Sequence, residues 1–162
     1  MHNQHQHPQM VIGFSFIIAL VLSIFPLPLS WGWFRPEFVA LVAIYWAVVF
    51  PQYFGIGYAW VIGMIQDVVE YSLLGQHALS LIAVVYICHL SYQRIRNYAL
   101  WQQAAWVFIF VGIHQLFWNW VHSLQGSAAD PAQFLLPALA SALAWPMLLI
   151  VMEWVRLRFR IQ

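Results

Sequence analysis

Charge is what this sequence lacks most. Of its 162 residues only 7% are charged, with six basic and five acidic side chains, and all six basic residues are arginines. A water-soluble domain of this size needs a charged shell, which so few charges cannot supply. The net charge is +1 and no basic face is present, so the chain also offers no surface for nucleic acid.

Cysteine and enzyme signatures are also scarce. The single cysteine, Cys88, cannot form an internal disulfide, and its apolar surroundings favour a small buried side chain. The sequence has no G-x-S-x-G, no H-E-x-x-H and no glycine-rich phosphate loop. The leader HNQHQH could hold a metal through its imidazoles, but a short His/Gln tail is more typical of a solvated leader. We therefore expect no catalysis, no metal site and no cofactor.

Apolar residues dominate instead. The chain is 64% hydrophobic and 18% aromatic, with a mean hydropathy of +0.76. A helix of ~20 apolar residues spans a bilayer, so we expect an all-α integral membrane protein with a single transmembrane domain over residues 1–162. The second of its apolar segments has the shortest core, which leaves a five-span arrangement as the alternative. Six spans are predicted, at 10–29, 36–54, 55–73, 76–92, 100–122 and 133–154.

The arginines predict the orientation of these spans. Six spans place five of the six arginines on one side of the membrane, with Arg35 alone on the other. The positive-inside rule then puts both termini in the cytoplasm, whereas five spans would separate the two arginine groups. The last three arginines are expected to anchor to anionic lipid headgroups, with a cytoplasmic partner as the alternative. The cytoplasmic arginines are Arg94, Arg96, Arg156, Arg158 and Arg160.

Polar side chains in two of the spans form the candidate site. Asp67 lies about 18 Å along the third span and His114 about 21 Å along the fifth, so their depths match. A charge at the centre of a span is unfavourable by ~2.5–3.5 kcal/mol, and such residues turn towards protein partners or a wet cavity. We expect Asp67 or Glu70 to face His114 or the stripe formed by Gln115 and Asn119. Three interpretations remain open: a hydrogen-bonded knot that fixes packing, a ligand or partner cavity, and a proton or ion relay.

Small residues mark one side of the third span. Gly57 and Gly63 precede Asp67, and Gly63, Asp67, Glu70 and Leu74 follow one helical line. Because small residues let a neighbouring backbone approach closely, we expect this line to face inward or towards a partner. Arg35, at the outer entry to the second span, is expected to meet a lipid phosphate, an acidic partner residue or the adjacent Glu37.

A set of residues spread over most of the chain follows an order that resembles one protein family. They are Arg35-Pro36, Tyr45-Trp46, Pro51, Gly57, Gly63, Asp67, Leu74-Gly75, Ala78 and the stretch RNYALWQQA from Arg96 to Ala104. Together they resemble the rod shape-determining MreD family of Gram-negative bacteria, especially its gammaproteobacterial members. After His114 the resemblance lies mainly in hydropathy.

The resemblance implies a multi-pass, non-enzymatic component of the cell inner membrane that scaffolds lateral peptidoglycan synthesis. The implied partners are MreC, the actin-like MreB, the glycosyltransferase RodA and a penicillin-binding transpeptidase, together with membrane lipids. The implied fold is similar to the six-helix S-components of vitamin transporters. The alternative is therefore a small membrane binding or transport subunit with a ligand cavity near Asp67 and His114.

Overall fold

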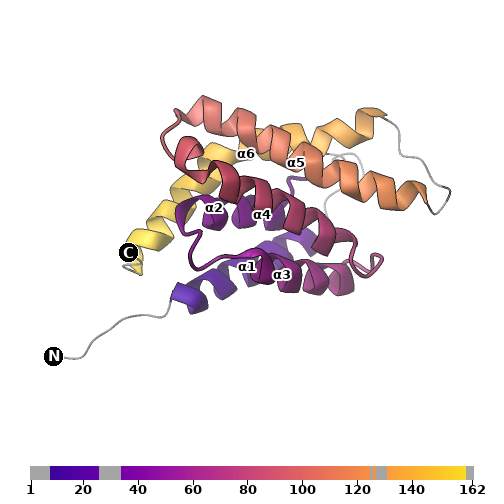
Figure 1. Cartoon of the computed structure of the whole chain (residues 1–162), viewed down its shortest axis with the longest axis horizontal. Coiled ribbons are helices and arrows are strands. Elements are labelled where there is room, and N and C mark those ends of the chain that lie inside the picture. The colour runs from indigo at the N-terminus through magenta and orange to yellow at the C-terminus, as the bar shows by residue number, and fades with distance from the viewer. Residues whose placement is uncertain (1–7, 26–33, 125, 127–130, 160–162) are drawn as a thin grey trace.

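The structure, a computed structural model, describes residues 8–25, 34–124, 126 and 131–159. Over these residues the chain is helical, with no β-strand (Figure 1). Each helix overlaps one of the predicted segments, so the all-helical class and the number and order of helices are confirmed. The helices are α1 (Pro8–Ile24), α2 (Phe38–Val49), α3 (Ile56–Val69), α4 (Gln76–Ile95), α5 (Leu100–Ser123) and α6 (Pro131–Arg158).

The helices fall into two length classes. In α4, α5 and α6 the apolar stretches are long enough to cross a membrane, judged by length and composition. The helices α1, α2 and α3 are shorter, with 17, 12 and 14 residues. The predicted segments 36–54 and 55–73 are therefore longer than the helices they contain. The first of these helices ends at Val49 because Pro51 disfavours a helical conformation at Phe50, whose φ and ψ are −133° and 64°.

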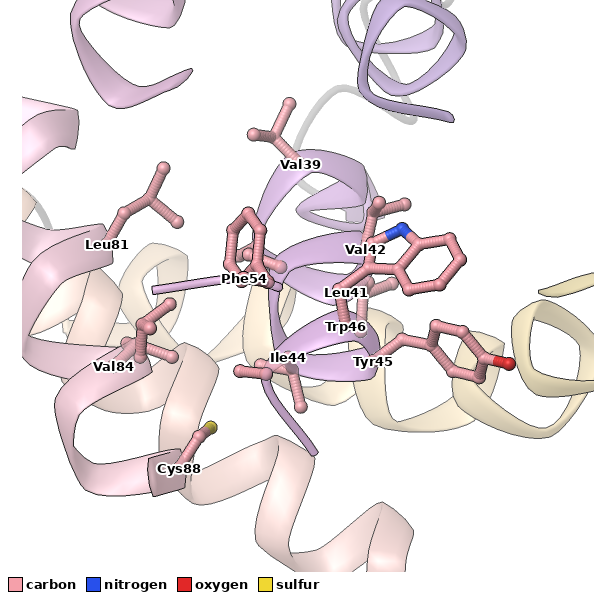
Figure 2. Packing of buried hydrophobic residues seen from close by; sticks show 14 of the residues in the cluster. Val39, Leu41, Val42, Ile44, Tyr45, Trp46, Phe54, Leu81, Val84 and Cys88 are labelled. Carbon is pink, nitrogen blue, oxygen red and sulfur yellow. The ribbon is translucent and has the colours of Figure 1, made fainter. Parts of the chain in front are cut away.

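The short helix α2 is the centre of the molecule. Every residue from Val39 to Val48 is buried, and α2 packs against α1, α4, α5 and α6. Figure 2 shows Leu81, Val84 and Cys88 on one side of α2, with Tyr45 and Trp46 pointing to the other. A helix enclosed by protein does not need to match the hydrocarbon thickness, which accounts for the short apolar core of this segment.

Two residues illustrate how closely the neighbours of α2 pack. The indole of Trp46 donates a hydrogen bond of 2.9 Å to Ser15 Oγ on α1. On the opposite side, Cys88 of α4 is fully buried and carries a free thiol, as its apolar sequence surroundings predict. The Trp46 indole N–H is thus paired within the core, and the small Cys88 side chain fills space beside α2.

Side chains of opposite character gather at the two ends of the bundle. The start of α1, the end of α6 and the connection between α4 and α5 lie on the left in Figure 1, and the ends of α3 and α5 on the right. We call the left end the basic pole; its described arginines are Arg94, Arg96, Arg156 and Arg158. We call the right end the polar pole; it is made by Glu37, Gln66, Asp67, Glu70, Ser72, His77, His114 and Gln115.

Candidate functional site

Asp67, on the last full turn of α3, caps the beginning of the next helix. Its side chain is completely buried. Its Oδ2 accepts the backbone N–H of Gly75 at 2.8 Å, and its Oδ1 accepts the backbone N–H of His77 at 2.9 Å. The first N–H groups of a helix have no partner within that helix, and the helix dipole favours a negative charge there. The acid is thus held in an apolar segment by the N-terminus of α4.

A tight turn between α3 and α4 makes this cap possible. Tyr71 and Gly75 both have positive φ angles, of 54° and 99°, and they reverse the chain within a few residues. The left-handed conformation is open to glycine without penalty but is unfavourable for tyrosine. Ser72, inside the turn, donates its hydroxyl to Asp67 Oδ1 at 2.7 Å.

His77 links Asp67 to the rest of the polar pole. Its Nδ1 lies 2.9 Å from Asp67 Oδ1, and its Nε2 lies 3.5 Å from Glu70 Oε2. Because a carboxylate only accepts hydrogen bonds, the shorter contact requires a proton on Nδ1. The imidazole ring also stacks at a tilt on the ring of His114, with 5.7 Å between the centroids. His77 therefore stands between the two acids and the histidine of α5.

Glu70 ties α3 to α1. Its Oε1 accepts the hydroxyl of Ser23 at 2.6 Å and the side-chain amide of Gln66 at 3.0 Å. Ser23 lies near the end of α1 and Gln66 is buried in α3, so the carboxylate joins two helices at their shared end.

Glu37 forms the second half of the polar pole and joins α2, α5 and α6. The side-chain amide of Gln115 donates to Glu37 Oε1 at 2.8 Å, and His114 Nε2 lies 3.8 Å from Glu37 Oε2. The backbone N–H of Glu37 donates to Ser141 Oγ of α6 at 2.9 Å. Glu37 was expected only as a possible partner of Arg35, so this role was not predicted from the sequence.

Asp67 and Glu70 were predicted to face His114, and the structure connects them to it through His77. Asp67, His114 and Gln115 are buried, but the hydrogen-bond partners of Asp67 lie on His77, Ser72 and Gly75. His77 was not among the residues predicted for the site. A usable signal was nevertheless present, because an acid that ends one helix can cap the next across a short turn ending in glycine.

Two further polar predictions have different outcomes. Asn119 Oδ1 is buried without a hydrogen-bond partner. Among the described residues Glu37 accepts the side-chain amide of Gln115 and none from Asn119. Arg35 donates from Nη2 to the backbone carbonyl of Leu22 at 3.0 Å, which ties the entry of α2 to the end of α1. Contact of Arg35 with a lipid phosphate stays a prediction.

The glycine line of α3 is partly as predicted. A Cβ atom on Gly63 would overlap the backbone of Ala78, with 2.6 Å to its nitrogen, so α3 and α4 touch backbone to backbone here. Gly57 has nothing within 4 Å of such an atom and makes no close approach. Leu74 lies beyond the end of α3 and is exposed, so the predicted line of four residues stops at Glu70. A role of this line in binding a partner stays a prediction.

At the basic pole most of the described arginine side chains are exposed. Arg156 pairs with Glu153 at 2.7 Å, and the carboxylate of Glu153 also accepts the hydroxyl of Tyr45 at 3.1 Å. Arg94, Arg96 and Arg158 are exposed, and Arg160 lies outside the described residues. This arrangement leaves their charges available to lipid or partner groups.

A cleft opens beside the polar pole. It has a volume of about 360 Å³ and is lined by Glu70, Tyr71, Ser72, Leu73, Gln76, His77 and Trp118. Asp67 and His114 are not part of its lining. Within the described part of the chain, no three His, Cys, Asp or Glu side chains are grouped so that they could hold a metal ion.

Comparisons with known proteins agree on one family. A family model described as rod shape-determining protein MreD matches residues 4–155. A curated protein of Haemophilus influenzae named "Rod shape-determining protein MreD" is 34% identical to the chain over 146 residues, which are 90% of each chain. No solved structure matches. The likeness to vitamin-transporter S-components therefore stays a prediction.

Proposed function

This chain belongs to the rod shape-determining protein MreD family, and we propose that it serves cell shape as a non-enzymatic scaffold in the bacterial inner membrane. In this proposal the helical bundle supports the machinery that builds lateral peptidoglycan. The partners we propose are the ones implied by the family resemblance: MreC, MreB, RodA and a penicillin-binding transpeptidase.

The observation that carries the proposal is how the buried acid is used. Both carboxylate oxygens of Asp67 accept hydrogen bonds, from Ser72, Gly75 and His77. Glu70 and Glu37 likewise bind side chains of neighbouring helices. An acid engaged in this way holds helices in register, as a rigid scaffold requires.

Six membrane crossings with both ends in the cytoplasm are part of this proposal. The described arginines of the basic pole lie at the end where α1 begins and α6 ends, which the positive-inside rule assigns to the cytoplasm. The polar pole would then lie near the outer surface. The central α2 would cross inside a sheath of other helices, so its 12 residues need not face lipid.

Cell shape under controlled expression tests the proposal. In rod-shaped cells depleted of their own copy, the wild-type chain should restore rods and co-purify with wall-synthesis proteins. Gly63→Leu should yield rounded cells and poor recovery of the complex, because the side chain would force α3 away from Ala78. Gly57→Leu is the matched control on the same helix, with open space for the side chain.

Membrane levels of both variants are measured by immunoblotting and matched by adjusting expression. Normal rods and full recovery of the complex with Gly63→Leu would contradict the proposal that an intact α3–α4 framework supports wall synthesis. Rounded cells with the wild-type chain at its normal level would also contradict it.

A small binding or transport subunit is the second candidate function, and the cleft beside His77 is the observation in its favour. If it were correct, water-soluble vitamins, the ligands of the transporter subunits that the fold is expected to resemble, should raise the melting temperature of the purified chain. Glu70→Ala, in the cleft wall, should then abolish the shift while leaving cell shape unchanged. Absence of any ligand-dependent shift would leave the scaffold as the better account.

A further inference from the structure

An apolar groove runs along the side of the bundle, away from the polar pole's cleft. Its walls come from α1 and α6 and its floor from α2, with Ile18, Val42 and Met147 as representatives of the three helices. Its volume is about 1110 Å³, and its lining is apolar except for Ser15 and Arg158. The hydroxyl of Ser15 is already engaged with the Ile12 carbonyl and the Trp46 indole. The groove therefore suits an occupant that is almost entirely hydrocarbon.

One end of the groove carries an uncompensated positive charge. Arg158 lines the groove and is exposed, and no ion pair or hydrogen bond of its guanidinium occurs with the residues that the structure describes. Its neighbour Arg156 is paired with Glu153, whose carboxylate also binds Tyr45, so this acid is already engaged by other groups. An anionic group at the mouth of the groove would thus meet a free guanidinium.

The walls favour a lipid over another protein helix. Helices that pack in membranes use small residues at their interface, but large side chains such as Phe14, Met147 and Trp154 dominate these walls. Methionines, here Met10, Met147 and Met152, are flexible and adapt to an irregular hydrocarbon chain. Basic pockets between membrane helices on the cytoplasmic side are known to hold anionic lipid headgroups.

We propose that this groove binds one anionic phospholipid, with its phosphate on Arg158 and an acyl chain along α1, α2 and α6. The planar guanidinium can donate two parallel hydrogen bonds to phosphate oxygens. A zwitterionic lipid should bind less tightly, because the positive group in its headgroup cancels the negative charge of its phosphate. The site requires only that the chain lies in a membrane. Its failure would leave the role in cell shape untouched.

Native mass spectrometry of the purified full-length chain tests whether the charge of Arg158 contributes to lipid binding. The protein is titrated in detergent with phosphatidylglycerol and, separately, with phosphatidylcholine of the same acyl chains. Arg158→Gln should weaken phosphatidylglycerol binding about fivefold, the effect of one arginine near a membrane surface, and should leave phosphatidylcholine unchanged. Arg96→Gln, an exposed arginine of the same pole outside the groove, is the control and should retain binding. Equal binding by the two variants would overturn the proposal.

A second pair of variants tests the groove without changing charge. Ala144 lies partly buried in the groove wall. In the variant Ala144→Phe, the phenyl ring should occupy the space proposed for the acyl chain. Ala105→Phe adds the same ring to an exposed face of α5 outside the groove. Only the former should reduce phosphatidylglycerol binding, by at least fivefold. Retained binding in Ala144→Phe would place the lipid elsewhere.

Photo-crosslinking identifies the occupant in living cells without relying on a destabilising change. A photo-reactive diazirine side chain replaces Met147, which lines the groove and is largely exposed. Illumination should produce an adduct with the mass of one anionic phospholipid. A crosslinked dimer of this chain, or an adduct to another membrane protein, would show that a helix fills the groove and would overturn the proposal.

Discussion

At the scale of single residues, Asp67 explains how an acid persists in an apolar helix. Its carboxylate receives donors from the turn that follows α3 and from the first turn of α4. An isolated ionised group in this position would be strongly unfavourable, whereas one that accepts several hydrogen bonds is stabilised by them. The polar pole is therefore first a device for joining helices.

Replacing Asp67 tests that role. Asp67→Ala should lower the free energy of unfolding by about 3 kcal/mol, because it leaves the backbone N–H groups of Gly75 and His77 without this acceptor. Asp67→Asn should lose less, since its amide oxygen retains one acceptor. Reversible unfolding in mixed micelles, followed by circular dichroism, measures both. Glu70→Gln is the control, because the amide oxygen still accepts from Ser23 and Gln66; equal stability of Asp67→Ala and Glu70→Gln would contradict the assignment.

At the scale of elements, the contact between α3 and α4 depends on one glycine. The backbone of Ala78 occupies the place that a side chain on Gly63 would need. Close approach of this kind adds dispersion contacts along two helices, and it also sets Asp67 within reach of the beginning of α4.

Two alanine substitutions on α3 should therefore have opposite effects. Gly63→Ala should destabilise the chain by about 1–3 kcal/mol, as insertion of a methyl group into a packed contact does. Gly57→Ala should be neutral or stabilise by up to about 1 kcal/mol, because alanine favours helix and the space is open. Unfolding free energies in the same micelles measure both changes. A destabilisation by Gly57→Ala as large as that by Gly63→Ala would contradict the assignment of close packing to Gly63 and open space to Gly57.

Much of this architecture could be predicted from the sequence, because hydropathy reports which segments avoid water. The lengths of α2 and α3 could not be predicted in this way. Pro51 ends the first helix early, and the turn at Tyr71 and Gly75 ends the second, although apolar residues continue past both points. Hydropathy also cannot distinguish a helix buried in protein, such as α2, from one that faces lipid.

The candidate site was predicted in part for a similar reason. Helical periodicity brought Asp67, His114 and Gln115 into the same region by depth and face. Periodicity alone did not reveal His77, whose link to Asp67 follows from the capping turn between α3 and α4. It could not reveal Glu37 either, because the contacts of Glu37 depend on how separate helices are placed side by side. Those placements are tertiary and leave no local period in the sequence.

At the scale of the whole molecule, the two poles differ in charge and in packing. The polar pole gathers three acids and two histidines that are engaged with one another, while the basic pole presents exposed arginines. By the positive-inside rule, such a distribution predicts one direction of the bundle in a membrane. The scaffold proposal depends on this direction, since it assigns the arginines to the cytoplasmic leaflet.

Labelling of single introduced cysteines from one side of the membrane tests this orientation most directly. In spheroplasts treated with a membrane-impermeant maleimide, Tyr71→Cys and Leu124→Cys should react, because both positions are exposed at the polar pole. Gln9→Cys, Arg96→Cys and Arg158→Cys should react only after lysis. The unsubstituted chain is the control, since Cys88 is buried. Labelling of Gln9→Cys and Arg158→Cys from opposite sides would contradict the six-crossing bundle.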